Sequence, residues 1–118
     1  MAYKKVKFQG SKGHMLSGKI DFPLSNHIEA YAIFVHVFTG HKNLIAAKYI
    51  SRALTMNGIA VLRFDLTGLG DSDGDFSETN FSSNVDDILA AAKFLESEYQ
   101  APSIIVGQSL GGAASVFA

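Results

Sequence analysis

Three short apolar runs, separated by segments with helical periodicity, constrain the fold of this chain more than any other feature. The runs occupy residues 31–38, 59–65 and 103–107. A strand that is almost wholly apolar is usually covered on both faces, as in a parallel sheet. Parallel strands need long crossover connections, and crossover helices supply this cover. The sequence therefore predicts an α/β fold in which a mostly parallel sheet lies between two layers of helices.

An antiparallel hairpin is predicted before these runs. Val6 and Phe8 close a first short strand, and GSKG at residues 10–13 has the composition of a turn. Residues 14–22, HMLSGKIDF, alternate loosely between apolar and polar positions as a second strand. Two such strands joined by a turn that contains glycine are typical of a β-hairpin.

The segment between the first two apolar runs is predicted to be a helix. Asn43 is the expected N-cap, and the pair Asn57 and Gly58 is the expected stop signal. Polar side chains recur at helical spacing on an otherwise apolar segment and predict one solvated stripe, made of Lys48, Ser51, Arg52 and Thr55.

A second helix is predicted between residue 80 and Pro102. Apolar residues spaced at i, i+3, i+4, i+7 and i+10 predict one core-facing stripe, made of Val85, Ile88, Leu89, Ala92 and Leu95. Pro102 marks the end of this connection and the approach to the last apolar run.

Composition and charge exclude several classes of protein. The chain of 118 residues has 10 Lys and Arg against 11 Asp and Glu, so its bulk charge favours neither nucleic acid nor an anionic membrane. It has no cysteine for disulfides, thiolate metal sites or catalysis. No apolar run has the features of a secretory signal or a membrane span. We expect a cytoplasmic globular protein without metal or cofactor, forming a single domain or part of one over residues 1–118.

The candidate catalytic group is Ser109, at the centre of the motif G-x-S-x-G. A serine hydroxyl is a poor nucleophile, so chemistry needs exposure, a nearby base and donors for the oxyanion. The motif follows a predicted strand directly and precedes small helix-forming residues. In that context Gly107 and Gly111 permit a sharp strand-to-helix turn that exposes the serine. The backbone N–H of Leu110 is one expected oxyanion donor.

The second oxyanion donor is expected near the stretch HVFTGHK, and the backbone N–H of Phe38 is the candidate. His36 could act as a general base, but it lies inside an apolar strand and precedes the serine, which favours a structural histidine. His41 is a candidate ligand contact. His14 and His27 are expected at the surface.

The stretch DLTGLGDSDGDFSE, residues 65–78, has the composition of two ligand-binding motifs, but its spacing fits neither. A calcium loop of the EF-hand type needs an acid at its twelfth position, where counting from Asp71 places Ser82. A dinucleotide fingerprint needs G-x-G-x-x-G, and counting from Gly68 places Asp73 at the third glycine. We interpret the stretch as a strand-end turn whose carboxylates accept hydrogen bonds from local backbone N–H groups.

Taken together, these stretches resemble the α/β hydrolase family, and in particular its serine aminopeptidase-like members. HVFTGHK, GIAVLRFDLTGLGDSDGDFSETNFSSNVDD and VGQSLGGAA look like the hydrolase half of bacterial proteins that join an α/β hydrolase to a C-terminal OsmC-like domain. The resemblance spans nearly the whole chain. It implies a three-layer α/β hydrolase fold with a mostly parallel sheet and an N-terminal antiparallel hairpin. It also implies a small acyl substrate and an OsmC-like domain in the parent chain.

The implied activity is hydrolysis of a carboxylic ester, thioester or amide through an acyl-enzyme, with a Ser-Asp-His triad in that chain order. Ser109 matches the family nucleophile, and Leu110 and Phe38 match the positions whose backbone N–H groups form the oxyanion hole. Asp65 matches the structural acid of the D-x-x-G-x-G-x-S loop and not the triad acid. Many relatives have glycine where this chain has Val37, which affects how closely a substrate carbonyl can approach that loop.

The triad acid and histidine of the resembled family lie on later loops, and no residue of this chain matches either. We therefore expect residues 1–118 to be the N-terminal part of a longer hydrolase, truncated after the nucleophile elbow and inactive alone. Two alternatives stay open. One is a short pseudoenzyme or interaction fragment whose exposed sheet edge pairs with another chain. The other is a small-molecule binding module that uses the elbow without chemistry.

Overall fold

The computed structural model describes residues 2–10, 13–24, 27–35, 45–66, 72 and 81–107. The helices and strands of these residues follow the predicted order. They are β1 (Ala2–Gln9), β2 (Met15–Phe22), β3 (Ala30–Val35), α1 (Ile45–Met56), β4 (Ile59–Phe64), α2 (Phe81–Glu98) and β5 (Ile104–Gly107). The expected N-cap Asn43 and the predicted strand residues 36–38 lie outside the described residues.

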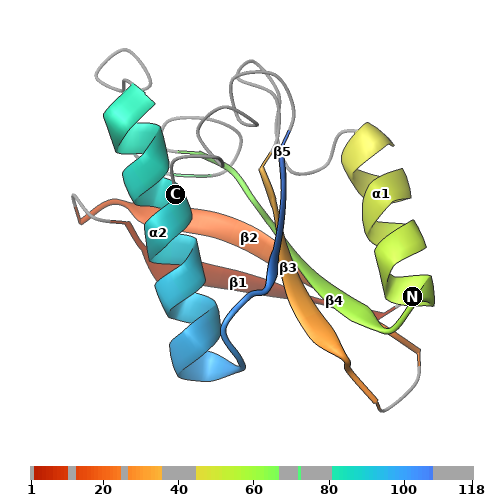
Figure 1. Ribbon diagram of the computed structural model, residues 1–118. Helices are drawn as coiled ribbons and strands as arrows, with labels where there is room; N and C mark the ends of the chain where they lie inside the picture. Colours follow the sequence, from red (N-terminus) through yellow and green to blue (C-terminus); the bar gives the residue numbers. More distant parts are fainter. Residues whose placement is uncertain are drawn as a thin grey trace.

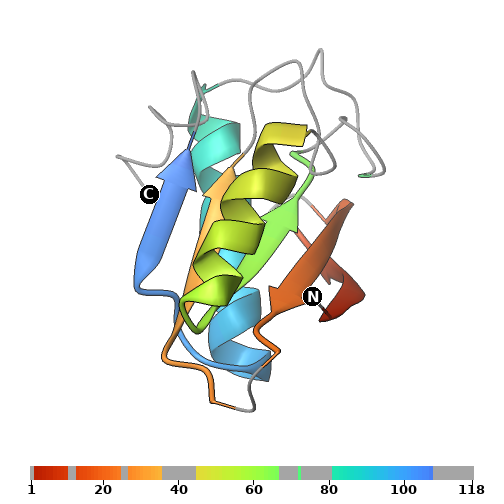
Figure 2. The same ribbon diagram turned by 90° about the vertical axis from the view of Figure 1, so that its right-hand side faces the viewer.

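The described strands form one mixed sheet in the order β1-β2-β4-β3-β5. The hairpin β1-β2 is antiparallel, as predicted, and β2 also runs antiparallel to β4. β3 lies between β4 and β5 and is parallel to both. Figures 1 and 2 show α1 on one face of the sheet and α2 on the other. This arrangement confirms the predicted α/β class and its three layers.

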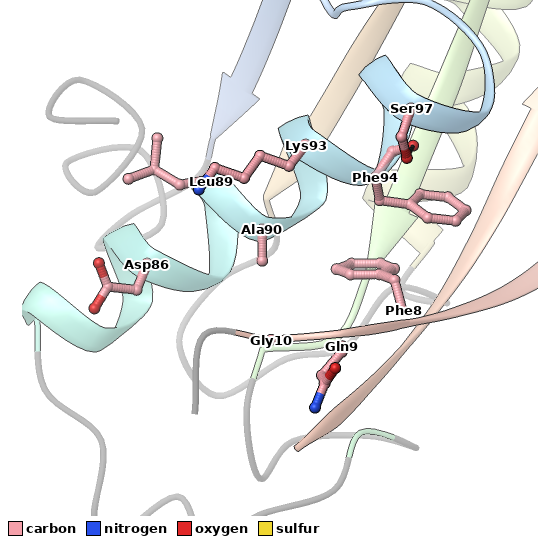
Figure 3. A pocket seen from close by; sticks show the side chains of 9 residues that line it. All are labelled: Phe8, Gln9, Gly10, Asp86, Leu89, Ala90, Lys93, Phe94 and Ser97. Carbon is pink, nitrogen blue, oxygen red and sulfur yellow. Dashed lines mark hydrogen bonds between the residues drawn. The ribbon is translucent and has the colours of Figure 1, made fainter. Parts of the chain in front are cut away.

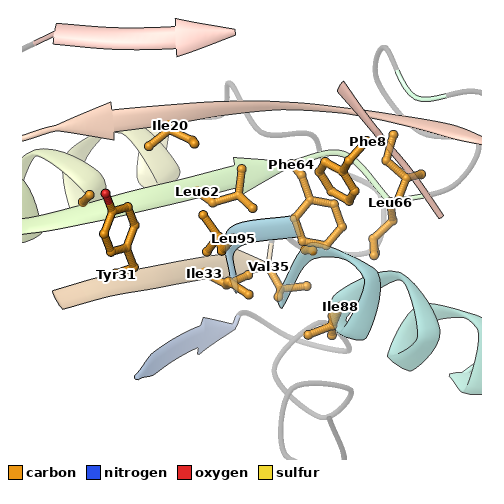
Figure 4. Packing of buried hydrophobic residues seen from close by; sticks show 13 residues of the cluster. Phe8, Ile20, Tyr31, Ile33, Val35, Leu62, Phe64, Leu66, Ile88 and Leu95 are labelled. Atoms are coloured by element: carbon orange, nitrogen blue, oxygen red, sulfur yellow. The ribbon is translucent and has the colours of Figure 1, made fainter. Parts of the chain in front are cut away.

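The two faces of the central strands contribute to two separate apolar clusters. On the α2 side, Ile33 and Leu62 pack with Leu95 in the larger cluster (Figure 4). On the α1 side, Phe34 and Val61 pack with partly buried residues of α1. Because alternate residues of a strand point to opposite faces, β3 and β4 need apolar side chains at almost every position. This is why both strands read as continuous apolar runs in the sequence.

The core-facing side of α2 differs from the predicted stripe at one position. Ile88 and Leu95 are fully buried, as predicted, but Leu89 is exposed. The buried face instead includes Ala91 and the carboxylate-bearing Asp87. A residue next to Ile88 is rotated by about 100° around the helix, which carries Leu89 away from the sheet. Apolar spacing alone cannot distinguish this face from its neighbour.

The predicted solvated stripe of α1 is only half correct. Lys48 and Arg52 are exposed, but Ser51 and Thr55 are buried against the sheet. The Thr55 hydroxyl donates to the Arg52 carbonyl at 3.0 Å, so it is satisfied within its own helix. Ser51 is small enough to fit between the helix and the sheet. The exposed side of α1 carries the large apolar residues Tyr49 and Met56 instead.

The end of α1 agrees with the predicted stop signal. Gly58 has a φ of 81°, in the left-handed region that favours glycine. The N–H groups of Asn57 and Gly58 donate to the last-turn carbonyls of Leu54 and Thr55. The Gly58 carbonyl then accepts from Glu29 N–H at 2.9 Å, which ties the helix end to the start of β3.

The connection from α2 into β5 is held by an aromatic contact and a backbone hydrogen bond. The ring of Tyr99, just after α2, lies 5.8 Å from the ring of Tyr31 and 6.0 Å from that of Phe22. Burial raises the pKa of the Tyr31 hydroxyl above its usual value of 10, and the nearby Tyr99 raises it further. Ser103 N–H donates to the Tyr31 carbonyl at 3.0 Å. These contacts place β5 beside β3.

A buried ion pair joins β2 to β4 beneath α1. Arg63 Nε donates to Asp21 Oδ2 at 2.7 Å, and Nη2 of the same guanidinium donates to Oδ1 at 3.3 Å. Both side chains are almost fully buried. The sequence analysis did not identify this pair, although Arg63 is the one charged residue in the otherwise apolar strand β4.

We predict that Asp21→Ala destabilises the fold by about 3–5 kcal/mol, because it leaves the buried guanidinium of Arg63 without its carboxylate. Urea unfolding of the full-length protein measures the change. The double variant Asp21→Leu/Arg63→Met is the control, since it removes both charges and should recover most of the loss. A loss below about 1 kcal/mol in Asp21→Ala would show that the pair is not desolvated as the structure indicates.

Gly18 allows β2 to approach β4 closely. A Cβ at this position would lie 3.0 Å from the Arg63 carbonyl oxygen and 3.1 Å from Leu62 Cδ1. We predict that Gly18→Ala destabilises the protein by about 1–3 kcal/mol, because the backbone of a central strand has little freedom to move away. Gly10→Ala is the matched control, since its nearest contacts would begin at an ordinary 3.4 Å. Equal melting temperatures for the two variants would contradict the prediction.

Candidate functional site

The carboxyl ends of the three parallel strands lie in one row. In the sheet register Val35 of β3 pairs with Phe64 of β4 on one side and with Gly107 of β5 on the other. Neighbouring strands are spaced by about 4.8 Å, so the ends of β4 and β5 lie about 10 Å apart across β3. In open α/β sheets this edge, where loops leave the strands, is the usual position of an active site.

The predicted elbow begins at this edge. Gly107, its first glycine, is the last residue of β5. The nucleophile Ser109, the oxyanion donors Leu110 and Phe38, and the second elbow glycine Gly111 all lie outside the described residues. Their roles therefore stay predictions, and the described structure provides the strand ends from which their segments continue.

Of the two described histidines, only His14 lies at this end of the sheet, on its antiparallel side, because β2 runs antiparallel to β4 with Gly18 opposite Phe64. His14 lies in the turn between β1 and β2, and His27 precedes β3; both are exposed, as predicted. His36 and His41, for which the sequence suggested a structural role and a ligand contact, lie outside the described residues.

On the β4 side of this edge, hydrogen bonds around Ser72 join the residues after β4 to β2. The Ser72 hydroxyl donates to the Asp65 carbonyl and accepts from Ser17 N–H at 2.9 Å. Asp65 N–H in turn donates to the Ser17 carbonyl at 2.9 Å. Ser72 and Asp65 are both buried. The backbone of the first residue and the hydroxyl of the last residue of D-x-x-G-x-G-x-S are thus bonded to each other and to β2, and the structural role inferred for the Asp65 carboxylate stays a prediction.

This use of a serine hydroxyl refines the sequence interpretation of the loop. The sequence analysis expected carboxylates of this stretch to accept local hydrogen bonds; Asp71, Asp73, Asp75 and Glu78 lie outside the described residues, and in the described part the Ser72 hydroxyl bonds the backbone. The serine that ends the motif D-x-x-G-x-G-x-S is the sequence signal from which this hydrogen bonding could have been predicted. A hydroxyl can donate and accept at once, so one buried Ser72 satisfies a carbonyl and an N–H group together.

A separate cavity of about 500 Å³ lies between the end of β1 and α2. Figure 3 shows the rings of Phe8 and Phe94 stacked against each other in its lining; their centroids are 5.1 Å apart at an interplanar angle of 19°. Asp86 and Lys93 contribute its charged groups. The Ser97 hydroxyl at its rim donates to the Phe94 carbonyl of its own helix at 3.1 Å. Ser97, the one serine among the described residues that line this cavity, therefore bonds within its own helix.

Two further properties concern only the part of the chain that the structure describes. No group of three or more His, Asp or Glu side chains there could hold a metal ion. Neither described helix is both long and apolar enough to cross a membrane.

Comparison with known proteins gives a match to a family and to a curated relative. The model of the family described as serine aminopeptidase, S33, matches residues 26–117. Palmitoyl-protein thioesterase ABHD10, mitochondrial, of Mus musculus is 34% identical over 80 residues. That stretch covers 68% of this chain and 26% of the mouse protein. The chain therefore matches about a quarter of the length of this relative.

Solved structures share the fold over nearly the whole chain. The esterase domain of a Rhodothermus marinus protein is 46% identical with a TM-score of 0.79, covering 98% of this chain and 44% of that one. Est1E of Butyrivibrio proteoclasticus, solved with ferulic acid bound, is 28% identical with a TM-score of 0.85. That match covers 93% of this chain and 45% of Est1E. The chain thus spans less than half of either structure.

We predict that Ser72→Ala lowers stability by about 1–3 kcal/mol, because it leaves the partly buried Ser17 N–H and the buried Asp65 carbonyl without this partner. Ser97→Ala is the matched control, since its exposed hydroxyl bonds only within its own helix, and its effect should stay within about 0.5 kcal/mol. Urea unfolding of both variants of the full-length protein measures the difference. If Ser72→Ala matched the control, the attachment of the residues after β4 to β2 would not depend on the hydroxyl.

Proposed function

Because the chain belongs to the serine aminopeptidase (S33) family of α/β hydrolases, we propose that Ser109 is the nucleophile of a serine hydrolase that cleaves carboxylic esters or thioesters. The observation that carries this proposal is the position of the motif G-x-S-x-G. It begins at Gly107, the last residue of a parallel strand in register with Val35 of β3. A strand end followed by this motif is the context in which the turn acts as a nucleophile elbow.

The second strand end supports the proposed oxyanion hole. Phe38 follows Val35 by three residues, and Ser109 follows Gly107 by two, while Val35 and Gly107 are paired. Three residues in an extended conformation span at most about 11 Å. The two loops therefore start from neighbouring points, as two N–H donors converging on one oxygen require. In this proposal the donors are the backbone N–H groups of Phe38 and Leu110.

In the proposed reaction the Ser109 hydroxyl oxygen attacks the acyl carbonyl carbon, and the two N–H groups stabilise the negative oxygen that forms. The bond to the alcohol or thiol then breaks, and the proton from Ser109 passes through a general base to the leaving group. Water hydrolyses the acyl-enzyme and restores the serine. The base, a histidine oriented by an acid, is proposed to come from sequence beyond residue 118, as the family resemblance implies.

Esters and thioesters are the favoured substrate class. The family carries the name of a peptidase, but the structure with 46% identity is described as an esterase domain and the mouse relative as a palmitoyl-protein thioesterase. Both kinds of acyl compound have a better leaving group than an amide, and both form the same acyl-enzyme. Amide hydrolysis is the less favoured alternative for the same nucleophile.

We predict that Ser109→Ala lowers turnover of a p-nitrophenyl acyl ester and of an acyl thioester by about 10³-fold or more, since the nucleophile is lost. The full-length protein is assayed by nitrophenolate release and by thiol release. Labelling of wild-type protein by a fluorophosphonate should disappear in the same variant.

Ser97→Ala, on the exposed side of α2, is the control and should keep wild-type turnover and labelling. Persistent turnover in Ser109→Ala would show that another group is the nucleophile. A wild-type protein that binds an acyl ligand without hydrolysing it, equally well after Ser109→Ala, would favour the binding-module alternative.

A further inference from the structure

The most exposed large apolar side chains of the described residues gather beside α1. Leu24 is 84% exposed, Met56 80%, Tyr49 67% and Tyr3 59%. The other exposed large apolar residues in the described part of the chain, Met15, Leu89 and Ile105, are at most 40% exposed. The four lie on three different elements or their ends. Their gathering on one side of the fold is a property of the tertiary structure that no sequence spacing reveals.

These four residues line two adjoining cavities. Leu24 and Met56 line a cavity of about 480 Å³ near the end of α1. Tyr3 and Tyr49 line a second cavity of about 470 Å³ between α1 and the β1-β2 hairpin. Arg52 lines both, so the cavities form one continuous surface. We call this surface the α1 flank. In Figure 2, α1 lies in front of the sheet with β2 beside it.

Cationic side chains accompany the apolar ones. Lys19, Lys48 and Arg52 all line the α1 flank. Lys19 Nζ lies 5.2 Å from the centre of the Tyr3 ring, a cation–π distance. Lys48 and Arg52 are exposed one helical turn apart, and like charges at i, i+4 destabilise a helix by a few tenths of a kcal/mol. Two carboxylates accompany these cations: Asp21 is bound by the buried Arg63, and the exposed Glu29 side chain lies beside Gly58.

We propose that the α1 flank docks the protein on the surface of an anionic membrane. Exposed aliphatic side chains enter the apolar boundary of a bilayer, and tyrosines lie at the level of the lipid headgroups. Lysine and arginine beside them bind the phosphates of anionic lipids. The near-neutral charge of the whole chain predicts no such binding. The local grouping of cations with exposed apolar residues is what favours it.

The shape of the α1 flank favours a lipid surface over a protein helix or a small anion. Leu24 and Met56 are more than three-quarters exposed although they line a cavity, so most of each side chain projects outward from the cavity into solvent. A small anion would use Lys48 and Arg52 but would leave these two apolar side chains in water. A membrane surface covers the cations and the apolar residues together.

Membrane docking and hydrolysis would use different surfaces. The α1 flank runs along the side of the fold, from Arg63 near the carboxyl end of β4 to Gly58 at its amino-terminal end. The predicted elbow begins at the carboxyl end of the parallel strands, after Gly107. Substitutions on the α1 flank should therefore leave hydrolysis of a soluble ester unchanged.

The test is co-sedimentation of the full-length protein with vesicles. Vesicles of equal parts phosphatidylcholine and phosphatidylglycerol should bind the protein, and vesicles of pure phosphatidylcholine should bind it at least about tenfold less. Lys48→Glu/Arg52→Glu should weaken binding to the anionic vesicles by about tenfold or more. Leu24→Ser/Met56→Ser should weaken binding to the anionic vesicles by a similar factor. Added salt should weaken only the part of the binding that the cations contribute.

Lys93→Glu and Leu89→Ser are the matched controls, because both residues are exposed on α2 at the opposite face of the sheet. They should bind vesicles as the wild type does, and circular dichroism checks that all variants are folded. Equal binding to both vesicle types, or full binding after Lys48→Glu/Arg52→Glu, would overturn the proposal. So would binding of monomeric dihexanoyl-phosphatidylglycerol without vesicle binding, which would indicate a small-ligand site. Ester hydrolysis in the same preparations tests Ser109 independently.

Discussion

Burial of both faces of β3 and β4 is the constraint on which the rest of this structure depends. Alternate side chains of these strands enter two different apolar clusters, one under α1 and one under α2. A strand with two apolar faces is stable only where a layer covers each face. The parallel pairing, the crossover helices and the interior positions of β3 and β4 in the sheet all follow from this requirement. The hairpin β1-β2 extends the same sheet on its antiparallel side.

The same parallel pairing places the chemistry at one edge. Because β3, β4 and β5 run in the same direction and in register, their carboxyl ends form a row, and each following loop begins from that row. The Ser72 hydroxyl holds the loop after β4 against β2 through backbone groups. The predicted nucleophile segment follows β5, and the predicted oxyanion loop follows its neighbour β3. The α1 flank lies on the side of this framework, which separates the proposed membrane contact from the proposed catalysis.

Much of the fold could be predicted because periodicity and turn chemistry are local. The runs YAIFV and IAVLRF became strands, and the Asn57-Gly58 pair ended α1 with the positive φ that glycine permits. Helix faces were less predictable. Leu89 was placed in the core but is exposed, while Ser51 and Thr55 were placed in water but are buried. One residue corresponds to about 100° of helix rotation, so a small rotation against the sheet changes which side chains are covered.

The sequence by itself determined the order of the elements, the α/β class and the identity of the candidate nucleophile, because each depends on residues close together in the chain. Only the tertiary structure decided which distant residues meet. Asp21 and Arg63 lie far apart in the sequence and form a bidentate buried pair because β2 and β4 are neighbours. Tyr3, Leu24, Tyr49 and Met56 share one surface because the hairpin lies beside α1. Strand order sets these contacts, and strand order is chosen by the packing of the whole sheet.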